Sequence, residues 1–372
     1  MKRITVDLGA RSYPIYIAAG CLNQIGDIVS SHQLERKIAL ITDENVGPLY
    51  SDAVEAALKA SGFQVSVYVL PAGEASKSLE TADKLYEYLI RDRFDRKSTI
   101  ISLGGGVIGD VGGFIAATFM RGIRFVQIPT TLLAQTDSSV GGKVGINHRF
   151  GKNLIGAFYQ PCFVLIDPQV LETLPLRERR AGMAEVVKYG LIADETFFDF
   201  LAGHLEDVIQ LAPSGDVEGV IETCCSIKAR VVQQDEREGG LRQILNFGHT
   251  AGHALEALTN FEFYRHGEAV AMGMRCMTWL SWQSDFISEA DFSRIDALLQ
   301  RFPQPSPQPV FESNEILEKI YSDKKVFDGK LNVVLLSKIG EALVKKNLDP
   351  KAMLAALEWM NRSSDEIKQY YR

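Results

Sequence analysis

The sequence has little cysteine, and what it has does not form a disulfide framework or a thiolate metal site. The five cysteines are odd in number and scattered, and no two of them form a C-x-x-C pair; they are Cys21, Cys162, Cys224, Cys225 and Cys276. This pattern favours free thiols in a reducing compartment, so we expect a cytoplasmic protein.

Long apolar runs and an excess of basic residues are missing as well. No segment reaches the roughly 18 consecutive apolar residues of a membrane span, and the opening "MKRITVDLG" lacks the apolar run of a secretory signal. The net charge of −7 argues against general nucleic-acid binding, because phosphate backbones require a basic surface. The composition is that of a globular protein, and we expect neither a membrane nor a nucleic acid among its partners.

The chain is, however, long. Its 372 residues exceed the length that one hydrophobic core ordinarily supports, so two domains are expected. Up to about residue 170, the apolar runs "KIALITD", "QVSVYVLP", "STIISLGGG" and "FVQIPTT" alternate with helical stretches. This alternation predicts βαβ units in a mostly parallel sheet, with the opening residues as a hairpin at its edge. We therefore predict an α/β nucleotide-binding domain over residues 1–174 and a mainly α-helical domain over residues 175–372.

A glycine-rich turn follows one of these predicted strands. In "ISLGGGVIGDVGGF", Gly104, Gly106 and Gly109 have GxGxxG spacing between a strand and a helix, as in loops that hold a pyrophosphate. Alone the motif is weak, and a tight strand–helix turn explains it nearly as well. The acid that usually binds the ribose about 20 residues downstream is missing. Asp43, at the end of "ALITD", is the better candidate, and the hydroxyl-rich loop "PTTLLAQTDSSVGGK" is a second candidate for ligand contacts.

The predicted helical domain concentrates histidine. Three of the six histidines in the chain, His249, His253 and His266, lie within 18 residues, and the first two share a helix face at i, i+4. Glu185 and Lys188 share a face of another predicted helix, where a self-contained ion pair is the simpler interpretation. Catalytic zinc typically takes three protein ligands from His, Asp and Glu. The spacing favours such a site but does not say which two histidines join the glutamate.

Several cations lie in glycine-rich or apolar surroundings, which is unusual for solvated side chains in an acidic protein. Each of them alone is explained as an exposed charge, but together they predict an anionic substrate with phosphate or carboxylate groups. They are Lys143, Lys152, Lys188, Lys228, Arg242, Lys324 and Lys325.

A series of motifs resembles the consecutive signatures of the 3-dehydroquinate synthase family. They are "GGGVIGDVGGFIAATFMRG", "IPTTLLAQTDSSVGGKVGIN", "GKNLIGAFYQP", "AGMAEVVKYG", "LNFGHTAGHALE" and "HGEAVAMGM". They occur in order from about residue 40 to about residue 335. The wider superfamily, which includes other sugar-phosphate cyclases and iron-dependent alcohol dehydrogenases, is similar in the GGG turn and the two-domain layout but not in the full series.

The resemblance implies a cytoplasmic lyase of the shikimate pathway, which leads to the aromatic amino acids. It also implies that the enzyme is a homodimer. Such an enzyme converts the sugar phosphate 3-deoxy-D-arabino-heptulosonate 7-phosphate into 3-dehydroquinate and phosphate, with NAD and one divalent metal, Zn²⁺ or Co²⁺. The implied steps are transient oxidation by NAD, β-elimination of phosphate, re-reduction, ring opening and intramolecular aldol closure.

The resemblance also implies a role for individual residues. Glu185, His249 and His266 would bind the metal, and His253 would face the substrate. The implied catalytic residues are Lys152, His253, Asp137, Asn246 and Lys188. The implied substrate contacts are Arg121, Lys143, Asn153, Lys228, Arg242 and one of Lys324 and Lys325. The implied NAD contacts are Asp43, Glu74, Lys77, Gly105, Gly106, Asp110, Thr130, Thr131, Lys143 and Lys152.

Two alternatives remain open from the sequence. A related cyclase acting on another heptulose or hexose phosphate would keep the metal and NAD but change the substrate pocket. A non-enzymatic NAD-binding or scaffold protein would bind no metal and would tolerate His249→Ala. For Arg121, the simple interpretation is a cation at a helix C-terminus, whereas the resemblance implies that it reaches the substrate phosphate of a neighbouring subunit.

Overall fold

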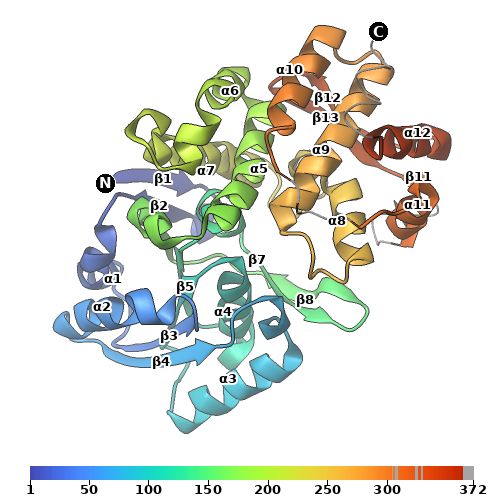
Figure 1. Ribbon diagram of the computed structural model, residues 1–372. Helices are drawn as coiled ribbons and strands as arrows, with labels where there is room; N and C mark the ends of the chain where they lie inside the picture. The colour runs from blue at the N-terminus through green and yellow to red at the C-terminus, as the bar shows by residue number, and fades with distance from the viewer. Residues whose placement is uncertain (304, 306–308, 323–325, 328–329, 363–372) are drawn as a thin grey trace. The chain divides into compact units, whose positions relative to one another are not determined.

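The protein divides into two compact units in a computed structural model that describes residues 1–303, 305, 309–322, 326–327 and 330–362 (Figure 1). The first unit comprises Met1–Pro175 and Asp216–Arg237, and the second comprises Leu176–Gly215 and Glu238–Arg372. The sequence analysis predicts two contiguous domains, residues 1–174 and 175–372, whereas the grouping in the structure is not contiguous. The segment Asp216–Arg237 belongs with the first unit instead of the helical one.

The first unit is built on a seven-stranded sheet with the strand order β1-β2-β9-β6-β5-β3-β4. All neighbouring strands in it are parallel except the antiparallel pair β1 and β2 at one edge. The mostly parallel sheet and the N-terminal hairpin at its edge are thus confirmed. The strands are β1 (Lys2–Val6), β2 (Tyr13–Ile17), β3 (Lys37–Asp43), β4 (Gln64–Leu70), β5 (Thr99–Gly104), β6 (Arg124–Pro129) and β9 (Phe163–Ile166).

Helices cover both faces of this sheet. The face that carries Ile38 and Leu40 packs on α1 and α2, and the face that carries Ala39 and Ile41 packs on α3 and α4. Successive strand residues point to opposite faces, so a strand buried on both sides is apolar at nearly every position. The helices are α1 (Ile25–Ser31), α2 (Gly47–Ala60), α3 (Leu79–Arg91) and α4 (Gly106–Thr118).

Helix α7 (Val217–Gln234) explains why the domain prediction differs from the structure. It packs against β1 and against the short helical turn Ala134–Ser138 of the first unit. Its buried residues include Cys225, whose thiol donates to the carbonyl of Gln135. The helical periodicity of this segment is as predicted, but periodicity does not say which unit receives the apolar face.

An antiparallel hairpin of β7 (Lys143–His148) and β8 (Gly151–Phe158) also lies in the first unit. The sequence predicts a loop up to Lys143, where this hairpin begins. Strand β7 packs on α4, where Gly113 leaves room for Val144: a Cβ at Gly113 would lie 2.3 Å from Val144 Cγ1. A glycine-rich, polar stretch lacks the apolar pattern that predicts a strand, so a strand held by such packing cannot be predicted from the sequence.

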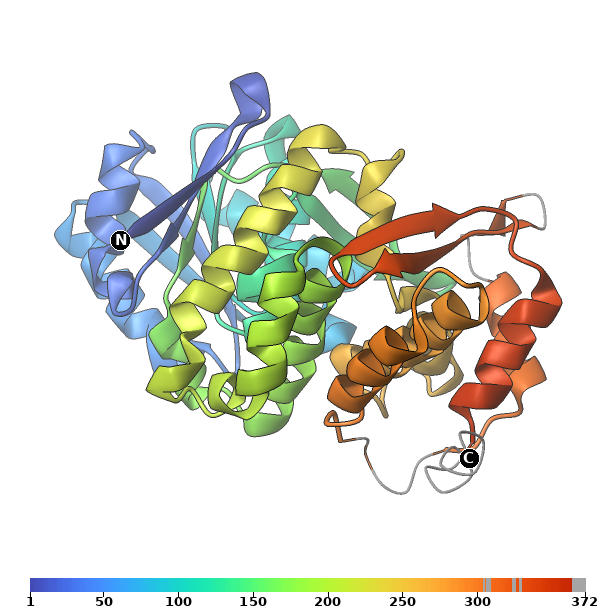
Figure 2. The ribbon, with the colours of Figure 1, turned by 90° about the horizontal axis from the view of Figure 1, so that it is seen from above.

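The second unit is mainly helical, as predicted, and α9 lies at its centre. Helices α5, α8, α10 and α12 all pack on α9, and the antiparallel hairpin β12–β13, which was not predicted, lies along it (Figure 2). The helices are α5 (Leu176–Ala193), α6 (Glu195–Ile209), α8 (His249–Leu258), α9 (His266–Gln283), α10 (Glu289–Leu299), α11 (Ser313–Ser322) and α12 (Pro350–Met360). The strands are β10 (Val326–Phe327), β11 (Lys330–Leu331), β12 (Val333–Lys338) and β13 (Glu341–Lys345).

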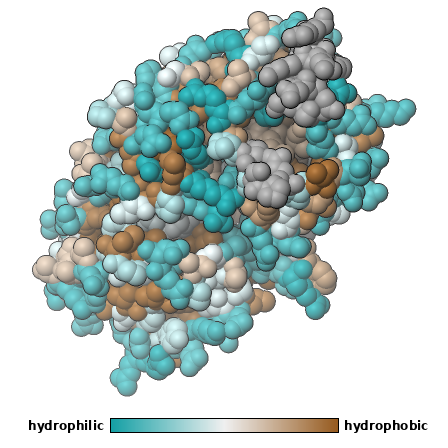
Figure 3. All heavy atoms as spheres, in the orientation of Figure 1, coloured by the Kyte–Doolittle hydropathy of each residue, from teal (hydrophilic) through white to brown (hydrophobic). Residues whose placement is uncertain are grey.

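The surface shown in Figure 3 is mostly hydrophilic, with hydrophobic residues in separate patches. Scattered apolar side chains are ordinary on a globular protein and mark no site by themselves. Among the residues that the structure describes, none of the helices combines the length and the apolar character needed to cross a membrane.

Candidate functional site

The three clustered histidines of the sequence converge in the second unit. His249 begins α8, His253 lies one turn later, and His266 begins α9. Donor nitrogens of the three imidazoles all lie within 4.8 Å of one another. Close packing of the helices brings the three rings together, and this packing requires glycine at positions 267 and 273, where a side chain would clash. A Cβ at Gly267 would lie 1.8 Å from the carbonyl oxygen of Ala181 on α5, and one at Gly273 would lie 1.9 Å from that of Gly248.

Glu185 of α5 lies beside this cluster and is fully buried. Its Oε1 is 3.4 Å from Nε2 of His249 and 3.3 Å from Nε2 of His266. Its other oxygen pairs with the ammonium of Lys188, which is also buried. The ion pair expected between Glu185 and Lys188 is therefore present, and the same carboxylate contacts two histidines as well.

The Nδ1 atoms of the two histidines that contact Glu185 have partners of their own. Nδ1 of His249 lies 3.1 Å from the carbonyl oxygen of Phe247, and Nδ1 of His266 lies 3.1 Å from Oε2 of Glu256. Burial alone would lower the pKa of His266, but the carboxylates of Glu256 and Glu185 outweigh it and raise that pKa. Each imidazole thus turns its Nε2 toward the shared carboxylate oxygen of Glu185.

Two further predicted site residues belong to this unit. Arg242 is almost completely buried, with 1% of its surface exposed, and Asn246 donates from Nδ2 to Oε1 of Glu238 at 2.6 Å. A guanidinium presents several N–H donors in one plane, which suits a carboxylate or phosphate group. The predicted residues Lys324 and Lys325 lie outside the residues that the structure describes.

In the first unit, several predicted cofactor contacts lie where parallel strands end. Asp43 ends β3, Gly105 and Gly106 follow β5, and Thr130 and Thr131 follow β6. Strands β3, β5 and β6 are parallel neighbours, so these residues share the carboxyl edge of the sheet. The chain order reverses between β3 and β5, and such a switch point is where open α/β sheets bind ligands.

The local geometry at this edge leaves polar groups for a ligand. Helix α4 begins at Gly106, and no side chain caps its N-terminus. Within the described residues, the hydroxyl of Thr130 is buried and has no hydrogen-bond partner. Asp43 uses only Oδ1 in the hydrogen bonds described, which it accepts from the backbone N–H groups of Asn45 and Val46. A helix N-terminus with adjacent hydroxyl and carboxylate groups suits a nucleotide with its phosphates and ribose.

A polar network joins the other predicted contacts of this unit. The buried ammonium of Lys77 donates to Oδ2 of Asp110 and to Oδ1 of Asn153, each at 2.6 Å. Burial alone would lower the pKa of Lys77, but the carboxylates of Asp110 and Glu74 raise it, so the ammonium stays charged. Lys152 lies next to Asn153 on β8, with its Nζ 3.9 Å from Oε1 of Glu74. The network holds Lys152 and Asn153 near the loop that carries Glu74 and Lys77.

Asn147 belongs to this network, although the sequence analysis did not identify it. Its side chain donates to Glu74 at 2.8 Å and accepts from the backbone N–H of Asn153 at 2.9 Å. Its own backbone N–H donates to the carbonyl of Lys77 at 2.8 Å. The hairpin of β7 and β8 brings Asn147 within hydrogen-bond distance of Asn153, so the linear sequence holds no signal for this contact.

Buried Lys228 and half-buried Asp137 form a second ion pair in the first unit. Nζ of Lys228 donates to Oδ1 of Asp137 at 2.6 Å and to its carbonyl oxygen at 2.7 Å. Lys228 comes from α7, so the unexpected position of that helix explains the pair. Lys143 begins β7 and is exposed.

Arg121 lies in a tight turn between α4 and β6. Met120, Arg121 and Gly122 all have positive φ, at 50°, 66° and 114°. Two consecutive non-glycine residues in this region are uncommon, and strained backbone of this kind concentrates at functional sites. Arg121 is exposed, and its guanidinium does not cap the preceding helix in any hydrogen bond described.

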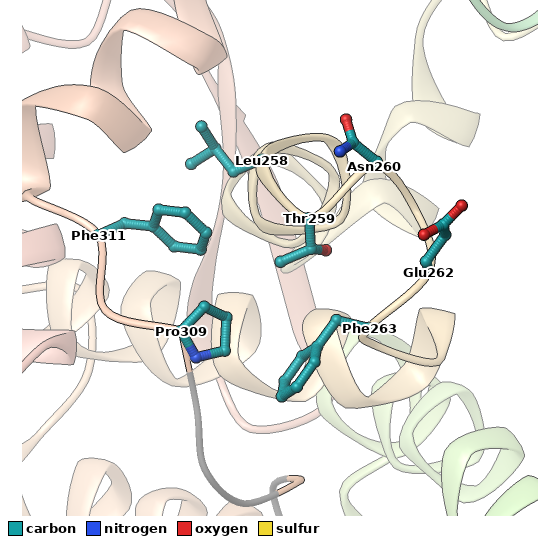
Figure 4. Close-up of a pocket in the computed structure, with 7 residues that line it drawn as sticks. All are labelled: Leu258, Thr259, Asn260, Glu262, Phe263, Pro309 and Phe311. Atoms are coloured by element: carbon teal, nitrogen blue, oxygen red, sulfur yellow. The ribbon is translucent and has the colours of Figure 1, made fainter.

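A hollow in the second unit lies apart from this chemistry (Figure 4). It is bounded by the end of α8, by the loop that follows and by Pro309 and Phe311. Glu262 is the one ionisable residue among those that line it. None of the predicted site residues lines it, so we do not regard it as the active site.

Similarity to known proteins covers nearly the whole chain. Residues 67–181 match the family model "3-dehydroquinate synthase N-terminal", and residues 182–326 match "3-dehydroquinate synthase C-terminal". The 3-dehydroquinate synthase of Desulforamulus reducens is 50% identical over 358 residues, which cover 96% of this chain and 99% of that relative.

Two solved structures of related cyclases have the same fold. One is 2-epi-5-epi-valiolone synthase from Streptomyces hygroscopicus subsp. jinggangensis 5008 with NAD⁺ and Zn²⁺ bound. It is 26% identical with a TM-score of 0.85, and the match covers 94% of this chain and 96% of that one. The other is 2-deoxy-scyllo-inosose synthase complexed with carbaglucose-6-phosphate, NAD⁺ and Co²⁺. It is 26% identical with a TM-score of 0.86, and the match covers 96% and 99%.

Proposed function

The chain belongs to the 3-dehydroquinate synthase family, and we propose that it converts 3-deoxy-D-arabino-heptulosonate 7-phosphate into 3-dehydroquinate and phosphate. The observation that carries the proposal is the convergence of Glu185, His249 and His266 in the second unit. The family's activity needs both NAD and a divalent metal, and the residues of each unit can be tested for their fit to one of these groups.

The donor set in the second unit fits a divalent metal. Bonds of about 2.0–2.1 Å to a tetrahedral zinc ion separate its ligand atoms by about 3.3–3.4 Å. Oε1 of Glu185 lies at this separation from Nε2 of both His249 and His266. We propose these three residues as the ligands. A bound zinc or cobalt ion would supply a Lewis acid that stabilises negative charge developing on a substrate oxygen.

The sheet edge in the first unit fits NAD. Asp43 has the carboxylate for a ribose, the uncapped start of α4 has backbone N–H groups for a pyrophosphate, and Thr130 has an unpaired buried hydroxyl among the described residues. Side chains at Gly105 and Gly106 would crowd Thr131 and Ser138, at 3.0 and 3.1 Å. NAD would supply reversible hydride transfer, which no side chain offers.

Residues around the proposed metal ligands would handle protons and anionic groups. We propose that His253, whose nitrogen lies within 4.8 Å of those of His249 and His266, transfers a proton at the substrate. Buried Arg242 and Lys188 would bind the anionic groups of the substrate. The roles that the family resemblance implies for Lys152, Asn153, Asp137, Lys228, Lys143 and Asn246 remain part of the proposal.

We also propose a cytoplasmic homodimer. All five cysteines are free thiols, which suits a reducing compartment. The strained, exposed turn at Arg121 suits a residue that serves a neighbouring subunit.

The proposed activity predicts release of phosphate from the heptulosonate phosphate by the purified protein. A chelator should abolish the release, and added Zn²⁺ or Co²⁺ should restore it, because the bound metal stabilises charge on the substrate. Phosphate and 3-dehydroquinate should appear in equal amounts. Faster turnover of another heptulose phosphate or of a hexose phosphate would instead identify a related cyclase, as in the two solved structures.

A second expected result concerns NAD. The substrate and the products are at the same overall oxidation level, so NAD should be required but not consumed. Protein stripped of NAD should release phosphate at less than about 1% of the normal rate. Without NAD the substrate hydroxyl is not oxidised to a ketone, and only this ketone acidifies the C–H bond on the neighbouring carbon. Adding NAD should restore the rate with no net reduction of the nicotinamide. Undiminished phosphate release by the stripped protein would contradict the proposed mechanism.

A further inference from the structure

Glu256 is a buried carboxylate on α8 that lies outside the set of proposed metal ligands. Only 4% of its surface is exposed. It follows His249 and His253 at positions i+7 and i+3 on α8, so all three side chains share one face of that helix. Its Oε2 lies 3.1 Å from Nδ1 of His266, across the helix pair α8 and α9.

The contact of Glu256 is with Nδ1 of His266, the ring nitrogen on the far side from Glu185. The Nε2 of the same ring lies 3.3 Å from Oε1 of Glu185, where we propose the metal. The two nitrogens of an imidazole point away from each other, so Glu256 cannot share the ion that His266 would bind through Nε2. Glu256 can therefore influence the proposed ion only indirectly, through the imidazole of His266.

The two histidine ligands differ in this outer contact. Nδ1 of His249 faces a neutral backbone carbonyl, that of Phe247, whereas Nδ1 of His266 faces a carboxylate. A carboxylate accepts a stronger hydrogen bond from N–H than a peptide oxygen does. It also fixes the tautomer with the proton on Nδ1, orients the ring and makes Nε2 a better donor to a metal.

We propose that Glu256 is a positioning residue for the metal, acting through His266. The proposal rests on the proposed metal site and adds a fourth residue to it. Glu256 holds the Nδ1 proton of His266 and turns the Nε2 lone pair toward Glu185 and His249. His266 lies at the first residue of α9, directly after a loop, so its ring has less support from its own helix than that of a residue in mid-helix.

The test is the metal affinity of Glu256→Ala and Glu256→Gln, measured by competition with a chromophoric chelator for Zn²⁺. Glu256→Ala should bind Zn²⁺ about 10–100-fold more weakly, the usual effect of removing such an outer partner. Glu256→Gln keeps an oxygen that accepts from Nδ1 but loses the charge, so its loss should be smaller. With Co²⁺ in place of Zn²⁺, the visible absorption bands should shift in Glu256→Ala, because the His266 ring is no longer fixed.

Controls separate this proposal from the metal site itself. Glu262→Ala removes a carboxylate from the exposed loop that follows α8 and should leave Zn²⁺ affinity unchanged. His249→Ala should abolish binding if the metal site is correct. Wild-type affinity in folded Glu256→Ala, together with loss of metal in His249→Ala, overturns the role of Glu256 alone. If Glu256→Ala does not fold, wild-type affinity and an unshifted Co²⁺ spectrum in Glu256→Gln overturn it.

Discussion

Replacing either His249 or His266 with alanine should remove the bound metal and nearly all activity. Each substitution leaves two of the three proposed protein ligands, and a catalytic zinc site normally has three. The loss of metal affinity should exceed the roughly 10–100-fold loss expected when a residue that only hydrogen-bonds to a ligand, such as Glu256, is removed. Metal content of the dialysed variants, measured by elemental analysis, should fall below about one tenth of an equivalent.

His253→Ala is the matched control, because it removes an imidazole from the same cluster. We expect this variant to keep its metal and to lose activity through kcat, since His253 would transfer protons rather than bind the ion. The three variants therefore separate ligand from proton-transfer roles. Stoichiometric zinc in dialysed His266→Ala would remove that residue from the ligand set, and loss of zinc from His253→Ala would add His253 to it.

The sequence was sufficient to predict much of the first unit. The apolar runs of β3 to β6 and the helices between them follow from periodicity and length, because a strand buried on both faces must be apolar at nearly every position. The hairpin β7–β8 was not predictable in this way, since its stability comes from packing on α4 beside Gly113. The position of α7 was also hidden, because an amphipathic helix can bury its apolar face against either unit.

The candidate site shows the same division. The sequence predicted that Glu185 joins two of the three clustered histidines but not which two, and the structure places it beside His249 and His266. Glu256 had a detectable signal, since it repeats the helical spacing of the two histidines. Asn147 had none, because its contact with Asn153 depends on the pairing of two strands. A contact within one helix therefore leaves a pattern in the sequence, whereas a contact that depends on strand pairing is visible only after the chain is folded.

Arg121 gives the other large expected effect, because we propose that it binds the substrate phosphate of the neighbouring subunit. A guanidinium grips phosphate oxygens through two parallel hydrogen bonds. Hydrogen bonds to charged groups contribute about 1.5–3 kcal/mol each, so Arg121→Ala should lower kcat/KM by about 10²–10⁴-fold. Arg124→Ala is the control, since it removes an exposed arginine three residues away at the start of β6. Its kcat/KM should stay within about twofold of the wild type.

A mixture of two inactive variants distinguishes a shared site from one within a single chain. In a hybrid of Arg121→Ala with His249→Ala, the Arg121→Ala subunit keeps its own metal ligands and receives an intact arginine from its partner. The site of the other subunit lacks His249 and also lacks an arginine from its partner. Random pairing of equal amounts makes half of the dimers hybrids, so about a quarter of all sites should be active. The measurement is phosphate release after subunit exchange, with exchange itself verified by differently tagged chains. Activity that stays at the level of the separate variants after verified exchange would mean that Arg121 acts within its own chain.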